Sequence, residues 1–192
     1  MMAGMKMGFA EQHTAIEVDP DLPEAIFAYA PPAEAKLVEQ FGPPGASMDK
    51  TEFVGKPTPA FVLKGLEGQE VKLADFAGKV LIVDFWATWC GPCKAELPTF
   101  VALQSQYADQ GFSLIGLSVD DSADQVRPFA QEHHLNFPLL MADAKVREAY
   151  GNISAIPTTF VIDKKGIVRY THVGSPEDLL IFQRQVEELL AE

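Results

Sequence analysis

Two cysteines carry the clearest chemical signal in this chain of 192 residues. Cys90 and Cys93 flank the dipeptide Gly91-Pro92, and the chain holds no other cysteine. A pair at this spacing can form a structural disulfide, contribute to a metal site, or cycle between dithiol and disulfide. A bridge that closes so short a loop stabilises a fold by only about 2 kcal/mol in chain-entropy models, and a domain of this length does not need it. The spacing therefore favours a redox dithiol.

A metal site is the weaker alternative. A closed zinc site takes four ligands, usually two cysteine pairs or one pair with clustered histidines. None of the four histidines has the H-x₃₋₅-H spacing of such sites: they are His13, His133, His134 and His172. We therefore expect no metal and no other cofactor.

The residues around the cysteines predict a strand that leads into a helix. Residues 80–86 form a short apolar run rich in β-branched residues, which is typical of a buried strand. Residues 92–107 have helical spacing, and Pro92 falls in the first turn, where a missing N–H is tolerated. Cys90 then lies at a helix N-terminus, where backbone N–H groups and the helix dipole stabilise a thiolate. We predict that Cys90 is the attacking nucleophile and that Cys93, one turn further on, is the resolving thiol.

The rest of the pattern predicts an α/β fold around one sheet. Apolar runs on either side of residues 64–69 indicate a β-hairpin before the buried strand. Further strands are expected at 112–118, 137–141, 158–163 and 167–173, and further helices at 123–133, 145–150 and 176–190. The last helix is predicted to have Ser175 as its N-cap.

Composition and charge limit the class of protein. The hydrophobic fraction of 47% and the charged fraction of 22% are ordinary for a globular protein. The net charge of −12 argues against a nucleic-acid partner. No apolar run approaches the roughly 18 residues of a membrane-spanning helix, and residues 1–10 lack the apolar stretch of a secretory signal.

The first 50 residues differ from the rest of the chain. Proline and glycine recur through residues 1–50, and three Lys against eight Asp and Glu give this segment a charge of −5. We expect an N-terminal arm or spacer there, packed loosely or partly disordered. A single redox domain is predicted over residues 51–192.

A longer motif surrounds the cysteines, VDFWATWCGPCK at residues 83–94. This segment resembles the active-site segment of the thioredoxin superfamily, and more specifically that of the TlpA/ResA-like thiol–disulfide oxidoreductases. The resemblance runs from about residue 53 to residue 192. Further matching segments are GKPTPAF at 55–61, Glu96-x-Pro98, NFP at 136–138 and AIPTTFVID at 155–163. The resemblance implies a thioredoxin-like three-layer α/β/α sandwich with an N-terminal β-hairpin extension.

The resemblance also implies roles for individual residues. Asp84 lies within the apolar strand, where burial would raise its pKa, and it is expected to act as general acid and base toward Cys93. The peptide bond between Ile156 and Pro157 is expected to be cis, with the Ile156 backbone pairing to an extended substrate segment. The substrate-binding residues implied in this way are Trp89, Gly91, Pro92, Ile156 and Pro157.

Two further acids are candidates for tuning the pKa values of the cysteines. Glu96 matches an acidic position of the TlpA-like proteins, and the alternative is an ordinary solvated residue on a helix surface. Asp121 follows a predicted strand near the active-site end of the sheet, and the alternative is that Asp120 and Asp121 cap the helix that begins after Ser122.

These observations predict a thiol–disulfide oxidoreductase that exchanges its Cys90–Cys93 dithiol with protein disulfides, as a reductant supplied by an upstream thiol donor. A thiol peroxidase is one alternative, but its motif P-x₃-[ST]-x₂-C would need a proline where this chain has Val83. A redox-silent binding module is another, and the intact Cys-Gly-Pro-Cys argues against it. We expect a monomer.

The resemblance implies an extracytoplasmic, periplasmic location in a bacterium, with a membrane anchor that this sequence lacks. Proteins of this kind serve cytochrome c maturation or the reduction of periplasmic thiols. The Pro-rich, acidic residues 1–50 suit a spacer from such an anchor. A chain that is complete as given would instead predict a cytoplasmic protein.

Overall fold

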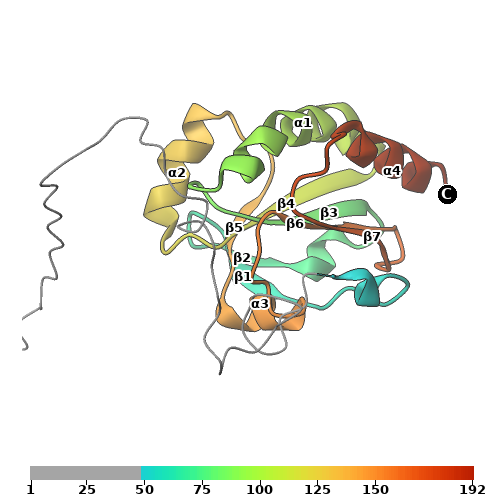
Figure 1. Ribbon diagram of the computed structural model, residues 1–192, viewed down its shortest axis with the longest axis horizontal. Coiled ribbons are helices and arrows are strands. Elements are labelled where there is room, and N and C mark those ends of the chain that lie inside the picture. The colour runs from blue at the N-terminus through green and yellow to red at the C-terminus, as the bar shows by residue number, and fades with distance from the viewer. Residues whose placement is uncertain (1–48) are drawn as a thin grey trace, which may run out of the picture. The chain divides into compact units, whose positions relative to one another are not determined.

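A five-stranded sheet forms the centre of residues 49–192, the part of the chain that the computed structural model describes (Figure 1). The arm predicted over residues 1–50 lies almost entirely outside the described residues. The order of the strands across the sheet is β5-β4-β3-β6-β7. Their bounds are β3 Val80–Trp86, β4 Phe112–Ser118, β5 Leu139–Met141, β6 Thr158–Ile162 and β7 Val168–Val173.

The central position of β3 and β4 in the sheet explains why both strands are continuous apolar runs in the sequence. Strand β3 pairs in parallel with β4 and antiparallel with β6. Every residue of β3 and of β4 is buried, because both faces of these strands are covered. The loop that carries the cysteines therefore begins at the carboxyl end of the central strand β3.

Helices cover both faces, in the three-layer arrangement that the sequence predicts (Figure 1). One face carries α1 (Gly91–Tyr107), α2 (Ala123–Glu132) and α4 (Leu180–Ala191). The other carries α3 (Ala144–Ala149) and the predicted hairpin, whose strands are β1 (Val62–Lys64) and β2 (Glu70–Lys72). Three short 3₁₀ helices complete the described elements, at Thr51–Phe53, Leu73–Phe76 and Ala108–Gln110.

Alternate side chains of β3 belong to two different hydrophobic clusters, one on each face of the sheet. Ile82 and Trp86 belong to the cluster that contains the cysteines and the inner side of α1, whereas Val83 and Phe85 belong to the cluster beneath α3. Successive side chains of a strand point to opposite faces. Asp84, between Val83 and Phe85, therefore lies on the α1 face.

The last helix differs from the prediction. It begins at Leu180, with Leu179 as its N-cap, so the expectation of a helix from residue 176 capped by Ser175 is wrong. The carboxylate of Asp178 accepts a hydrogen bond from the Leu180 N–H at 3.0 Å and another from Arg184 at 2.8 Å. A short polar side chain that bonds to nearby backbone in this way competes with the helix, and here it delays the start by about one turn.

Candidate active site

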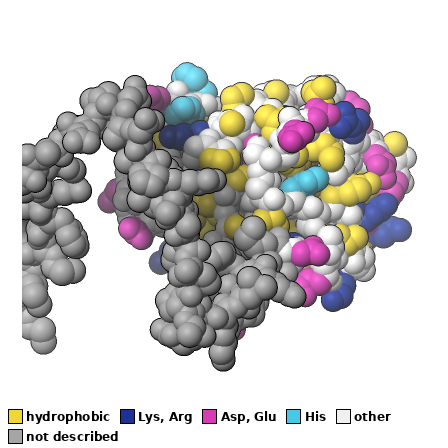
Figure 2. All heavy atoms as spheres, in the orientation of Figure 1, with side chains coloured by type: hydrophobic (Ala, Val, Ile, Leu, Met, Phe, Trp, Pro, Cys, Tyr) yellow, Lys and Arg dark blue, Asp and Glu magenta, His cyan; other side chains and the backbone are white. Residues whose placement is uncertain are grey.

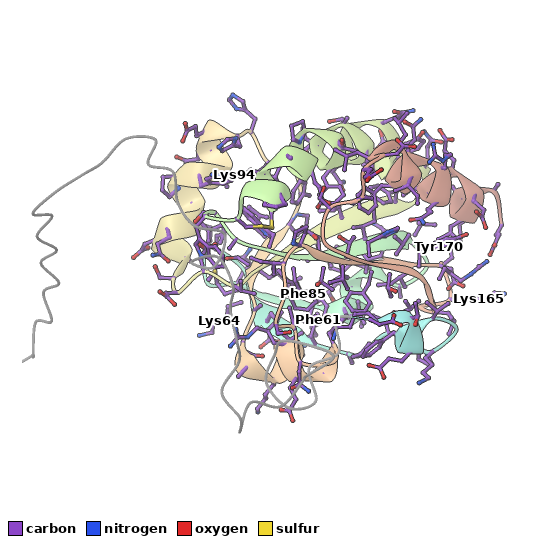
Figure 3. All side chains as sticks on the ribbon, viewed as in Figure 1. Phe61, Lys64, Phe85, Lys94, Lys165 and Tyr170 are labelled. Atoms are coloured by element: carbon purple, nitrogen blue, oxygen red, sulfur yellow. A yellow bond between two sulfur atoms is a disulfide. The ribbon has the colours of Figure 1, made fainter. Side chains whose placement is uncertain are left out.

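The two cysteines form a disulfide at the start of α1, with the sulfur atoms 2.01 Å apart (Figure 3, yellow bond). Cys90 is the N-cap of the helix, and its Sγ accepts a hydrogen bond from the Cys93 N–H at 3.2 Å. Pro92 falls in the first turn, as predicted. Cys90 is 5% exposed and Cys93 is 1% exposed, so Cys93 is the less accessible of the two.

The surface next to the disulfide is formed by a short exposed segment. Trp89 has 67% of its surface exposed, although large apolar side chains are usually buried. Gly91 and Pro92 are exposed as well, whereas Trp86 is fully buried in the core. An apolar side chain thus stands at the rim of the dithiol, where the sequence predicts the substrate contact.

Asp84 is buried on the α1 face of β3, as its apolar neighbours predict. It is 2% exposed, and its Oδ1 accepts a hydrogen bond from the Thr159 hydroxyl at 2.9 Å. Burial raises the pKa of Asp84 well above its ordinary value, and the nearby Glu96 carboxylate raises it further. The hydrogen bond from Thr159 offsets part of this rise.

Glu96 is completely buried on α1, so the alternative of a solvated helix residue is wrong. It lies one turn after Cys93, and residues three apart on a helix share a face, so its side chain faces the sheet together with that of Cys93. Burial raises the pKa of Glu96 to about 7, and the Ser175 hydroxyl offsets part of this rise. Ser175 is close, yet neither carboxylate oxygen has a hydrogen bond of acceptable geometry with any described residue.

Of the two acids after β4, it is Asp120 that contacts the active-site loop. Its carboxylate accepts hydrogen bonds from the Thr88 N–H at 3.0 Å, from the Thr88 hydroxyl at 2.6 Å and from the Ser118 hydroxyl at 2.8 Å. Asp121 is exposed. The tuning role predicted for Asp121 stays a prediction, whereas Asp120 anchors the loop that leads to Cys90.

The peptide bond between Ile156 and Pro157 is cis, as the resemblance implies. Pro157 is buried, and its carbonyl accepts a hydrogen bond from the Gly174 N–H at 2.8 Å. Ile156 is partly buried and packs against both hydrophobic clusters, including the one that contains the cysteines. This loop is therefore held in place on the side that leads into β6.

Thr159 and Asp120 contribute to the site, although the sequence pattern assigns neither of them a role in it. Thr159 is the register partner of Asp84 across β3 and β6, a pairing that follows from long-range strand alignment. Asp120 is adjacent to another acid, and only the conformation of the loop decides which of them points inward. The sequence does contain a short-range feature that favours Asp120, because the Ser118 side chain two residues earlier hydrogen-bonds to it.

Residues 49–192 contain neither a candidate metal-binding cluster nor a membrane-spanning helix. No group of three or more His, Cys, Asp or Glu side chains in this part of the chain could hold a metal ion. None of its helices has the length and apolar character that crossing a membrane requires.

A disulfide at a helix N-terminus, on a thioredoxin-like sheet and next to a buried acid, defines a thiol–disulfide oxidoreductase. Comparison with known proteins agrees. The chain belongs to the AhpC/TSA family, whose model matches residues 54–171.

Curated relatives carry names of the same class. The chain is 40% identical over 124 residues to the thioredoxin-like protein YneN of Bacillus subtilis, which covers 63% of this chain and 72% of that protein. It is 39% identical over 123 residues to the thiol–disulfide oxidoreductase ResA of Geobacillus thermodenitrificans, with coverage of 64% and 70%.

Solved structures give the same result. A putative thiol:disulfide interchange protein DsbE from Chlorobium tepidum superposes with a TM-score of 0.67 at 32% identity, covering 71% of this chain and 97% of that one. A putative protein disulfide isomerase from Bacteroides thetaiotaomicron gives 0.66 at 28% identity, with coverage of 72% and 91%. The predicted fold and the predicted thiol–disulfide oxidoreductase activity are therefore confirmed.

Proposed function

We propose that this enzyme is a reductant of protein disulfides, in which Asp84 accepts the proton of Cys93. The observation that carries the proposal is the pair of buried carboxyl groups, Asp84 and Glu96, on the face of the sheet and helix that also carries Cys93. Their pKa values are raised, to about 7 for Glu96. A buried carboxyl group whose pKa is raised in this way can act as a general acid as well as a general base.

The reaction runs in two exchange steps. The Cys90 thiolate attacks one sulfur of a partner disulfide, which forms a mixed disulfide and releases the other partner sulfur as a thiolate. Cys93 then passes its proton to Asp84, and its thiolate attacks the Cys90 sulfur. The partner leaves as a dithiol, two electrons have moved to it, and the enzyme is left with the Cys90–Cys93 disulfide. An upstream thiol donor reduces this disulfide again.

The partner segment binds next to the dithiol. Trp89 offers exposed apolar surface, with Gly91 and Pro92 beside it. The backbone of Ile156, before the cis proline, pairs with an extended segment of the partner by β-augmentation. Recognition through backbone hydrogen bonds accepts many sequences, which suits an enzyme whose substrates share a disulfide rather than a motif.

The cellular location that we propose for the enzyme rests on its similarity to named relatives. We propose an extracytoplasmic site, where the enzyme delivers electrons to oxidised thiols such as those of cytochrome c maturation. The support is similarity to proteins named ResA and DsbE, together with the spacer-like composition of residues 1–50. Fractionation of the source cells, with detection of the native protein in membrane, periplasmic and cytoplasmic fractions, tests this assignment.

The reduction potential of the Cys90–Cys93 couple tests the direction of electron flow. The couple is equilibrated against glutathione or dithiothreitol buffers and followed by fluorescence of Trp86 and Trp89. A value at or below about −230 mV agrees with a reductant, and a value above about −180 mV would reverse the direction. A Cys93→Ser variant should accumulate mixed disulfides with partners; binding of the same partners without any trapped disulfide would support a binding module instead.

A further inference from the structure

A cavity of about 390 Å³ lies at the end of the sheet away from the disulfide. Its walls come from residues 58–62, residues 72–79 and the β6–β7 turn at 162–166. Leu81, near the start of β3, also lines it, whereas Cys90 follows the end of that strand. Leu81 and Trp86 are five residues apart along β3, which corresponds to roughly 17 Å, so the cavity and the dithiol are separate sites. Figure 3 shows the separation between Lys165, at the cavity, and the yellow disulfide bond.

The walls of the cavity are apolar. The large side chains that line it are Phe61, Leu73, Phe76, Leu81 and Ile162. Ligand sites for small molecules typically have volumes of roughly 300–1,000 Å³ and mainly apolar walls with a few polar groups. Both the size and the lining of this cavity therefore suit a small apolar molecule.

The rim of the cavity is positively charged. Four lysines line it, Lys72, Lys79, Lys164 and Lys165, against one acid, Asp163. The carboxylate of Asp163 is already engaged, because its Oδ1 accepts the N–H groups of Lys165 and Ile167 and its Oδ2 lies 3.5 Å from Arg169. In a protein with a net charge of −12, four lysines around one cavity are unexpected. Figure 2 shows Lys and Arg side chains near the edge where Figure 3 places Lys165.

Two of the four lysines have their ammonium groups available. Lys72 pairs with Glu70 at 3.2 Å, and Lys164 donates to the Leu190 carbonyl at 2.7 Å. Among residues 49–192, the side chains of Lys79 and Lys165 make no ion pair or hydrogen bond, and the charge of Lys165 only contributes to lowering the pKa of Glu192. Each can therefore pair with the charge of a ligand seated in the cavity.

We propose that this cavity binds an anionic amphiphile, a carboxylate on a single alkyl chain, with the chain inside and the carboxylate at Lys79 and Lys165. Apolar walls alone would accept a neutral oil, and lysines alone would accept any small anion. The combination selects a molecule that has both parts. The proposal does not depend on the redox mechanism, because none of the residues that line the cavity belongs to the dithiol site.

Binding of alkanoates to the full chain tests the proposal. Octanoate, decanoate and dodecanoate are titrated by calorimetry below the concentrations at which they form micelles, beside 1-decanol and inorganic phosphate. We expect affinity to rise about threefold to fourfold for each added methylene until the cavity is full. Decanoate should bind more tightly than decanol, and phosphate should not bind measurably. The absence of saturable alkanoate binding, or equal affinities for decanoate and decanol, would overturn the proposal.

Variants locate the site. Lys79→Gln combined with Lys165→Gln should weaken decanoate binding about threefold to tenfold, as expected for partly exposed ion pairs, and leave decanol binding unchanged. Ala77→Leu, which places a larger side chain in the cavity, should weaken binding of both. Lys64→Gln is the matched control, because Lys64 is a lysine outside the cavity (Figure 3). Decanoate binding that none of the cavity variants alters would place the ligand elsewhere and contradict the proposal.

Discussion

The carboxylate of Asp120 accepts three hydrogen bonds, whereas those of Asp84 and Glu96, which are buried as well, accept one and none among the described residues. Asp120 bonds to the loop that leads to Cys90, and Glu96 follows Cys93 on α1 and acts on the charge of Asp84. Hydrogen bonds to a carboxylate compensate for its removal from water, and a buried carboxylate without them holds its proton more tightly. The well-bonded carboxylate of Asp120 therefore supports a fixed structure, whereas the poorly bonded carboxyl groups supply a site that can exchange a proton at neutral pH.

The two poorly bonded carboxyl groups also act on each other. The negative charge of Glu96 raises the pKa of Asp84, because two buried anions close together are unfavourable. Loss of the Glu96 proton therefore opposes loss of the Asp84 proton. The region around Asp120 has the opposite property, since its donors are in place before any reaction begins. Substitutions in the two regions should consequently have opposite effects.

Asp84→Asn should have the largest effect, which is a decrease in the rate of the second exchange step. Without a proton acceptor for Cys93, the second exchange step should slow by about a hundredfold or more near pH 7, as is usual for loss of a general base. The step is measured by loading Cys90 with a small thiol as a mixed disulfide and following release of that thiol by stopped flow.

The same variant should not lose stability. Its asparagine cannot ionise, so the free energy of unfolding at pH 8, measured with urea, should equal or exceed that of the original protein. The rate at which reduced Cys90 is alkylated serves as a control for the first step and should change little. A release rate equal to that of the original protein at every pH from 6 to 9 would contradict the role of Asp84 in the mechanism.

Glu96→Gln should change the pH dependence of stability. The pKa of Glu96 is about 7 in the folded protein, above its ordinary value of 4.5. Between these values the unfolded chain has lost the proton that the folded protein retains, so stability falls as pH rises through this window. The glutamine variant lacks this loss. The free energy of unfolding of the variant minus that of the original protein should increase by about 3 kcal/mol between pH 4 and pH 8.5.

Urea unfolding at closely spaced pH values measures that difference. Taking the difference between two proteins removes the contribution of all other titrating groups, and any constant cost of burying an amide cancels as well. A flat difference across the range would mean that Glu96 is ionised in the folded protein at acidic pH and that its surroundings are more polar than the structure indicates.

Asp120→Ala should lower stability, in contrast to the two preceding substitutions. It leaves the Thr88 N–H and the hydroxyl groups of Thr88 and Ser118 without their partner. An unsatisfied buried donor costs roughly 1–3 kcal/mol, and for three donors we expect a total loss of about 3 kcal/mol or more in urea unfolding. Asp121→Ala is the matched control: it changes an exposed acid next in the chain and should stay within about 0.5 kcal/mol.

The contrast between these carboxyl groups also separates what the sequence could predict from what it could not. The burial of Asp84 was predictable, because the residue interrupts an apolar run in a strand that must be central. The burial of Glu96 could have been predicted in the same way, since this residue is three positions after Cys93 on a helix and so shares its face.

The remaining differences depend on contacts between distant residues or on loop conformation. The choice between Asp120 and Asp121 is made by the path of the loop after β4, which periodicity does not describe. The pairing of Thr159 with Asp84 requires the register between β3 and β6, strands whose partner residues lie 75 positions apart. The start of α4 was placed too early because the Asp178 side chain forms a local turn, a competition that propensity alone does not resolve.

Thr159→Val should have the smallest effect and refines the comparison most directly. Valine has the shape of threonine without the hydroxyl, so the change removes the one hydrogen bond that Asp84 accepts from a described residue. Because this bond lowers the pKa of Asp84, its loss should raise that pKa further. The pH midpoint of the second exchange step should move upward with it.

Thr158→Val provides the control for this shift. Thr158 precedes Thr159 on β6, and its hydroxyl donates to the Ala155 carbonyl at 2.8 Å rather than to a carboxylate. Its neighbour across the sheet is Phe85, on the face away from Asp84. The control variant should therefore lose a little stability and keep the original pH midpoint. Equal shifts in the two variants would mean that the midpoint responds to general loosening of β6, and the specific bond between Thr159 and Asp84 would lose its assigned part in setting the proton affinity of the site.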